Sequence, residues 1–153
     1  MLTLTLILHN LVRWAAIGLG AMAVYRAFAG LSSGRFEEAD GKIGRFFAIS
    51  LDVQMLLGIM MYLFFSRITT SAFENMGSAM SNPVIRFWLV EHSTMMVAAL
   101  ALAHIGVARV RKGTQPKAKH RAGLIFFGIA ILVILVGTPW PWSTVARPIL
   151  PGM

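Results

Sequence analysis

The 153-residue sequence contains no cysteine, and only 13% of its residues are charged. The absence of cysteine excludes disulfide bonds, thiolate metal ligands and the Cys-x-x-Cys-His attachment site of c-type haem. Soluble domains contain about 25% charged residues and about 45–50% apolar residues. Here the charged fraction is half of that, and the hydrophobic content reaches 57%. This combination predicts an integral membrane protein.

Acidic residues are also scarce, with six Asp and Glu against fourteen Lys and Arg, for a net charge of +8. The basic residues flank long apolar segments and leave no soluble basic domain, so we attribute them to the positive-inside rule and exclude nucleic-acid binding. The first basic residue is Arg13. The N-terminus therefore lacks the charged region of a signal peptide, and we expect it to be a retained membrane span.

Four apolar segments are predicted to be membrane spans, because a hydrocarbon core is crossed by about 20 helical residues and the first three segments reach that length. They cover residues 2–29, 46–65, 86–111 and 122–136. Only helices and closed barrels satisfy the backbone in lipid, and these segments are too long and too uniformly apolar for barrel strands. We therefore predict an all-α, four-helix transmembrane bundle that forms one domain over residues 1–153.

The connecting segments carry local signals for where helices begin and end. Residues 30–45 are polar and rich in glycine, and we expect them to form a solvated loop. Asn82 followed by Pro83 predicts the start of the third helix, because asparagine caps a helix and proline is tolerated at its first position. Pro139 predicts that the fourth helix ends just before it.

The lysines and arginines are distributed unequally between the two sides of the predicted spans. One side has ten of them: Arg26, Arg35, Lys42, Arg45, Arg109, Arg111, Lys112, Lys117, Lys119 and Arg121. The other side has Arg13, Arg67, Arg86 and Arg147. The positive-inside rule predicts that the first side is cytoplasmic, which places both termini on the outer, periplasmic side of a bacterial inner membrane.

The third span contains ionisable residues that a simple lipid-facing helix would lack. Glu91, His92 and His104 all lie between Arg86 and Arg111 in an otherwise apolar run. Placing a charged group at membrane depth costs about 2.5–3.5 kcal/mol even on the lenient insertion scale. We therefore expect these side chains to face protein, water or a ligand.

His9 in the first span and His92 in the third span lie at similar depths, because the rise of about 1.5 Å per residue places both in the outer half of the bundle. Two imidazoles on different helices of a bundle form a typical ligand set for haem b. The sequence thus predicts one haem b between these spans, with His9 and His92 as metal ligands. Depth does not define rotation about the helix, so each histidine alternatively makes only a local hydrogen bond.

Charged residues at the same level suit the edge of such a site. Arg13 and Arg86 are expected to pair with haem propionates. Glu91 is expected either to orient a neighbouring imidazole or to pair with an arginine. Together these three residues are the predicted cofactor-binding groups around the histidine pair.

A second polar group lies deeper in the membrane. Asp52, Gln54 and His104 form a candidate proton or quinone site or, alternatively, a buried polar cluster that fixes the alignment of the helices. A second haem is disfavoured, because His92 and His104 differ by about 120° around the helix and about 18 Å along it. His120, between Lys119 and Arg121, is expected to be a solvated loop residue.

Several segments resemble a group of short bacterial four-helix membrane proteins described as cytochrome-b-like. The similar segments are LHNLVRW, DVQMLLGIMMYLF, RFWLVEHSTMM, AHIGVARVRK and HRAGLIFFGIAILVILVGTPWPW. They cover nearly the whole chain, and the EH…MM block and the terminal PWPW are the most distinctive parts. The resemblance implies a membrane-embedded cytochrome-b-like protein. Members of this group commonly have histidine where this chain has Asp52, so the second span carries no histidine ligand here.

Two functional hypotheses follow. The first is a small electron-transfer protein that passes electrons between a quinone or a partner redox subunit and the outer face. The second is a cofactor-free accessory subunit of a larger respiratory or photosynthetic membrane complex. An enzymatic role is less favoured, because the sequence lacks a nucleophile–base pair and an HExxH zinc motif. The methionines are expected to fill the core rather than to bind copper.

Overall fold

The computed structural model describes residues 1–146, and within that range it contains helices but no strands. Four helical segments are long and apolar enough to cross a membrane. They are α1 (Leu2–Ser33), α2 (Glu38–Met60) extended by the π-helix η1 (Met61–Phe65), α5 (Pro83–Arg86) with the π-helix η2 (Phe87–Glu91) and α6 (His92–Lys112), and α7 (Pro116–Gly137). The expected all-α architecture with four candidate membrane spans is confirmed.

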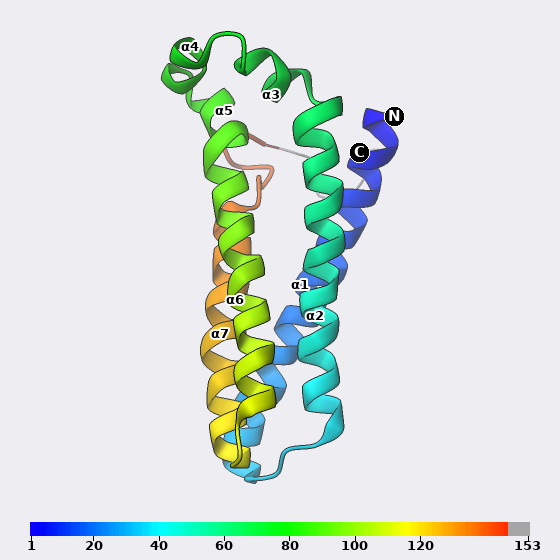
Figure 1. Ribbon diagram of the computed structural model, residues 1–153, viewed down its shortest axis with the longest axis vertical. Coiled ribbons are helices and arrows are strands. Elements are labelled where there is room, and N and C mark those ends of the chain that lie inside the picture. Colours follow the sequence, from blue (N-terminus) through cyan, green and yellow to red (C-terminus); the bar gives the residue numbers. More distant parts are fainter. Residues whose placement is uncertain (147–153) are drawn as a thin grey trace.

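The long helices lie side by side in one elongated bundle (Figure 1). Helix α1 packs against α2 and α7, and α6 packs against the same two helices, so α1 and α6 are diagonally opposite. Two short helices, α3 (Arg67–Ala72) and α4 (Met76–Ser81), connect the second and third spans at one end of the bundle. The start of α1 and the end of α7 lie toward that same end.

The segment 30–45, expected to be a loop, is mostly helical, and this prediction was wrong. Gly34 ends α1 in the left-handed conformation, with φ of +67°, and its N–H donates to the Gly30 carbonyl. A capping box then starts α2: the Glu37 side chain accepts from the Asp40 N–H, and the Asp40 carboxylate accepts from the Glu37 N–H at 2.8 Å. These two local devices shorten the connection to residues 34–37.

The predicted start of the third span is confirmed. The Asn82 side-chain oxygen accepts from the backbone N–H groups of Val84 and Ile85 at 3.0 and 3.2 Å, and Pro83 occupies the first helical position. The fourth span ends at Gly137, two residues before Pro139, as the sequence predicts. That ending leaves the Gly137 carbonyl without a partner inside the helix.

The centre of the bundle is built from small residues around two aromatic rings. Phe47 and Phe127 meet edge to face, with ring centroids 6.0 Å apart. Gly44 and Gly106 allow α2 and α6 to approach the Phe127 ring, because a Cβ at either position would lie 2.7 Å from it. Close approach of this kind stabilises helix association in lipid, where burial of apolar surface contributes little.

Candidate functional site

His9 and His92 face each other inside the bundle. His9 lies on α1 and His92 begins α6, and these helices are diagonally opposite. The ring centroids are 6.5 Å apart, and the ring planes make an angle of 63°. The structure therefore brings the two predicted metal ligands together across the bundle axis.

The end of α7 fixes the orientation of the His92 ring. Its Nδ1 lies 2.8 Å from the Gly137 carbonyl oxygen. A carbonyl only accepts hydrogen bonds, so Nδ1 carries the proton and Nε2 keeps its lone pair. The rings of Phe87 and Trp88, both from the π-helix η2, pack against this imidazole at centroid distances of 5.9 and 5.6 Å.

The His9 imidazole shows a matching arrangement with α2. The ring hydrogen-bonds to the backbone of Gln54, and Nδ1 is buried with no hydrogen-bond partner among the described residues. Because the helical N–H of Gln54 is already used and Nδ1 has no partner, we infer that the Gln54 carbonyl accepts from Nε2 and that Nδ1 keeps the lone pair. Gly58 lies beside the ring, since a Cβ there would be 3.6 Å from the His9 Cε1 atom.

Gln54 contributes a further polar atom to this part of the interior. Its side chain is 8% exposed, and its Oε1 is buried with no hydrogen-bond partner in the described part of the chain. A buried polar atom that makes no hydrogen bond costs about 1–3 kcal/mol. The interior next to the histidine pair thus presents acceptor atoms from both α1 and α2.

Arg13 supplies positive charge at the same level. It follows His9 by one helical turn, and its charge acts on both imidazoles. The guanidinium carbon lies 5.4 Å from the centroid of the Trp14 ring. A cation at this place suits a ligand that carries a carboxylate.

Glu91 and Arg86 pair with each other at the edge of the site. The Arg86 Nε donates to the Glu91 carboxylate at 2.7 Å, and both side chains are a little over 40% exposed. This is one of the two roles expected for Glu91. The charge of Arg86 is therefore already balanced by a carboxylate of the chain itself.

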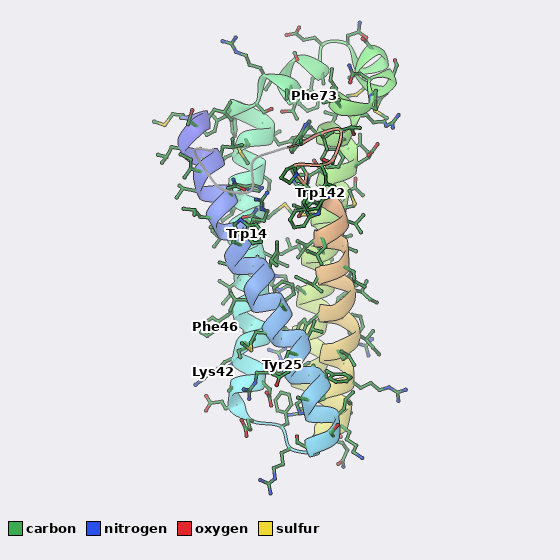
Figure 2. The ribbon with its side chains drawn as sticks, turned by 180° about the vertical axis from the view of Figure 1, so that it is seen from behind. Trp14, Tyr25, Lys42, Phe46, Phe73 and Trp142 are labelled. Atoms are coloured by element: carbon green, nitrogen blue, oxygen red, sulfur yellow. The ribbon has the colours of Figure 1, made fainter. Side chains whose placement is uncertain are left out.

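Tryptophans from two segments meet close to Arg13. Trp140, which follows α7, contacts Trp14 edge to face at 6.3 Å and stacks on Trp142 at 5.3 Å. Figure 2 shows Trp14 and Trp142 near this end of the bundle, far from Tyr25 and Lys42. The described residues after α7 thereby link this helix to α1 beside the histidine pair.

The deeper polar group is split by the structure. His104 on α6 and Asp52 on α2 form an ion pair at 2.9 Å, with side chains 51% and 45% exposed on the outer surface of the bundle. Gln54 is instead buried, with 8% exposure. Two residues apart on a helix means about 200° around it, so Asp52 and Gln54 cannot share a face.

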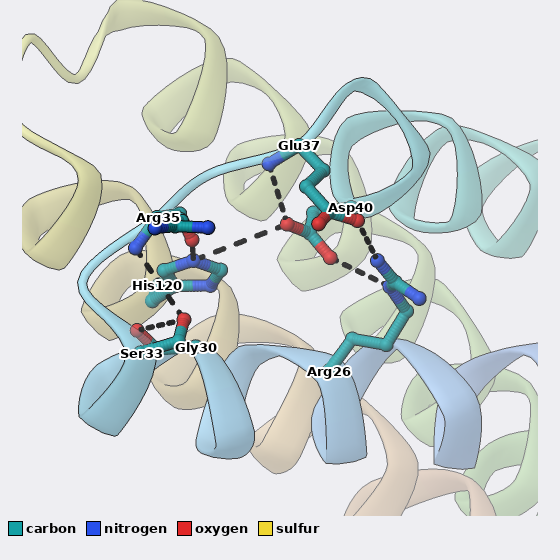
Figure 3. Close-up of polar contacts among 7 residues, drawn as sticks. All are labelled: Arg26, Gly30, Ser33, Arg35, Glu37, Asp40 and His120. Carbon is teal, nitrogen blue, oxygen red and sulfur yellow. Dashed lines mark hydrogen bonds and ion pairs between the residues drawn. The ribbon is translucent and has the colours of Figure 1, made fainter.

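His120 is buried, and the expectation of a solvated loop residue was wrong. It lies on α7 with 2% exposure, and its Nε2 is 2.7 Å from the Arg35 carbonyl oxygen and 3.9 Å from the Asp40 carboxylate (Figure 3). The ring sits directly against Gly30 of α1. The sequence feature that makes room for this ring is the absence of a side chain at Gly30, 90 residues earlier in the chain.

The same end of the bundle is held by a second polar contact. Arg26 of α1 donates to Asp40 at 2.6 Å and to Glu37 at 3.0 Å (Figure 3). The Asp40 carboxylate thus accepts hydrogen bonds from the Glu37 N–H and the Arg26 guanidinium, and it lies 3.9 Å from the His120 Nε2. These contacts join α1, α2 and α7.

No group of three or more His, Asp or Glu side chains among residues 1–146 is arranged to hold a metal ion. A zinc site needs three or four protein ligands. Haem iron takes four nitrogens from the porphyrin, so the protein supplies only one or two axial ligands. His9 and His92 therefore give this site two nitrogen donors, with no third carboxylate or imidazole donor among the described residues.

No protein-family model, curated protein or solved structure matches this chain. The resemblance to cytochrome-b-like proteins therefore stays a prediction from the sequence.

Proposed function

We propose that this chain is a membrane-embedded electron-transfer protein that holds one haem b between His9 and His92. The supporting observation is the facing pair of imidazoles, 6.5 Å apart between ring centroids. His9 and His92 would hold the haem from two different helices, and the haem would supply reversible one-electron chemistry.

The hydrogen bond that each imidazole makes to a backbone carbonyl supports the same proposal. A metal-binding histidine usually donates its other ring N–H to a carbonyl or carboxylate, which fixes the tautomer and the ring orientation. His92 donates to the Gly137 carbonyl, and His9 hydrogen-bonds to the backbone of Gln54. Each imidazole is thus held in place and keeps one nitrogen lone pair.

The surrounding residues have separate roles in this proposal. A bound haem b takes up and releases single electrons, with a potential set by its ligands and surroundings. Arg13 offsets the negative charge of a propionate, and Phe87 and Trp88 limit the access of water to His92. We further propose that electrons pass between a quinone or a partner redox subunit and the outer face.

A redox titration of the purified protein tests this function. We expect a reversible one-electron transition when the Soret band is followed against the applied potential. Purified protein that shows no reducible Soret band after expression with sufficient haem would contradict the proposal.

We propose that both termini face the periplasm of a bacterial inner membrane. The connections 34–37 and 113–115 lie at the same end of the bundle (Figure 1). Nine described Lys and Arg side chains flank them, and a tenth, Arg45, lies about one helical turn beyond Lys42 on α2. The opposite end has Arg13, Arg67 and Arg86, and Arg147 lies outside the described residues. This asymmetry follows the positive-inside rule.

The absence of cysteine makes this orientation simple to test. We expect Ser78→Cys, on α4, to react with a membrane-impermeant maleimide in intact spheroplasts. Thr114→Cys, in the connection between α6 and α7, should react only after lysis. The cysteine-free parent chain is the background control. The reverse labelling pattern would show that the cation-rich end faces outward.

The second candidate function is a cofactor-free subunit of a larger membrane complex. The half-exposed pair of Asp52 and His104 favours it, because polar groups within a span rarely face lipid. A partner helix over this surface would shield the pair. Isolation of the native protein discriminates the two: a larger assembly in which this chain holds no haem supports the accessory role.

A further inference from the structure

A hollow lies on the bundle surface between the last turns of α1 and the first turns of α7. Its volume is about 540 Å³. It is lined by Leu31 of α1 and by Lys117, Ala118, Arg121, Leu124 and Ile125 of α7. This end of the bundle is also the one that carries most of the basic side chains.

Two cations, Lys117 and Arg121, lie on one side of the hollow. Lys117 and Arg121 are four residues apart on α7, so their side chains project to the same side of the helix. Neither takes part in an ion pair among the described residues. The acidic residues nearby are paired with other cations, as Arg26–Glu37, Arg26–Asp40 and Lys42–Glu38.

The remaining lining is apolar and continues along the span. Leu124 and Ile125 follow Arg121 by about one turn, toward the bilayer centre, and Leu31 faces them from α1. The hollow therefore offers positive charge at the level of lipid headgroups and an apolar surface below it. A basic pocket between helices at the cytoplasmic surface is typical of a site for an anionic lipid.

A second hollow at the same end is also lined by two cations and apolar side chains. Its volume is about 610 Å³, and its lining combines Arg109 and Lys112 with Ile105 and Ala108 of α6. Cation pairs beside apolar side chains thus occur on two sides of the bundle. Basic residues that only attract the anionic membrane surface do not need a hollow beside them, so the two hollows favour binding of individual lipid molecules.

We propose that the hollow between α1 and α7 binds one anionic phospholipid. Lys117 and Arg121 hold the headgroup phosphate with charge-assisted hydrogen bonds, and an acyl chain lies along Leu31, Leu124 and Ile125. The proposal is independent of haem binding, and it assigns this end of the bundle a specific lipid rather than general contact with the bilayer.

Native mass spectrometry of the full chain with equal amounts of phosphatidylglycerol and phosphatidylcholine tests this site. We expect the wild type to retain phosphatidylglycerol preferentially. Lys117→Gln/Arg121→Gln should lower this retention about thirtyfold, because each of the two cations near an anionic lipid contributes on the order of 1 kcal/mol. Inorganic phosphate at millimolar concentration should not displace the lipid, because it cannot use the apolar surface.

The matched control is Arg45→Gln/Arg111→Gln, which removes the same charge from exposed positions at the same end that line neither hollow. Equal loss in both double variants, displacement by phosphate alone, or no lipid preference in the wild type would each overturn the proposal. If the Lys117/Arg121 variant does not fold, a photoactivatable phosphatidylglycerol on the wild type gives the answer. Cross-links should then map to residues 117–125, and cross-links spread evenly over the spans would contradict the site.

Discussion

Replacing His9 or His92 with alanine is expected to reduce bound haem from about one per chain to less than about a tenth of that value. Each substitution removes one of the two proposed ligands and leaves the other imidazole, 6.5 Å away between ring centroids, without a counterpart. His92→Ala also leaves the Gly137 carbonyl without its donor. Haem content is measured by the pyridine haemochrome assay on protein purified in detergent.

His104→Ala is the matched control for this pair of variants. It removes a third intramembrane imidazole, which lies about 18 Å from His92 along α6. This imidazole pairs with Asp52 and does not face His9. We expect it to keep the haem content of the wild type. Circular dichroism should show equal helix content in all three variants. Full haem content in either His9→Ala or His92→Ala would show that the replaced histidine is not a haem ligand.

Replacing Gly30 with alanine is expected to lower the free energy of unfolding by about 1–3 kcal/mol, the usual cost of overpacking a well-packed core. The added Cβ would overlap the Cε1, Nδ1 and Nε2 atoms of the His120 ring. That ring cannot move aside easily, because it is 2% exposed and its Nε2 is 2.7 Å from the Arg35 carbonyl. Detergent-induced unfolding followed by circular dichroism measures the change.

Gly18→Ala provides the control on the same helix, since nothing lies within 4 Å of the position of its added Cβ. We expect it to leave stability unchanged or to raise it by about 0.5–1 kcal/mol, because glycine weakens a helix interior. The double variant Gly30→Ala/His120→Ala should lose less stability than the sum of the two single variants, because the overlap is removed. Equal stability of Gly18→Ala and Gly30→Ala would show that His120 does not pack against Gly30 in this way.

The spans could be predicted from the sequence because their signals are local. Apolar length defines a membrane helix, and Asn82 with Pro83 specifies a helix start without reference to the rest of the chain. The equal depth of His9 and His92 also follows from the helical rise. Their rotation toward each other does not, because it depends on how α1 and α6 pack around the other two helices.

Other features depend on contacts between distant segments. His120 is buried because Gly30, 90 positions earlier, leaves space for its ring. The start of α2 was missed for a different reason: the Glu37–Asp40 capping box lies in a polar, glycine-rich stretch that is typical of loops. By contrast, the separation of Gln54 from Asp52 was predictable, since residues two apart on a helix point to nearly opposite sides.

The most direct test of the histidine pair as a haem site is the ratio of haem b to polypeptide in wild-type protein purified after expression with added haem precursor. Haem is quantified as the pyridine haemochrome and polypeptide by amino-acid analysis. We predict about one haem b per chain. A ratio near zero in monodisperse, fully helical protein would contradict the proposed electron-transfer function.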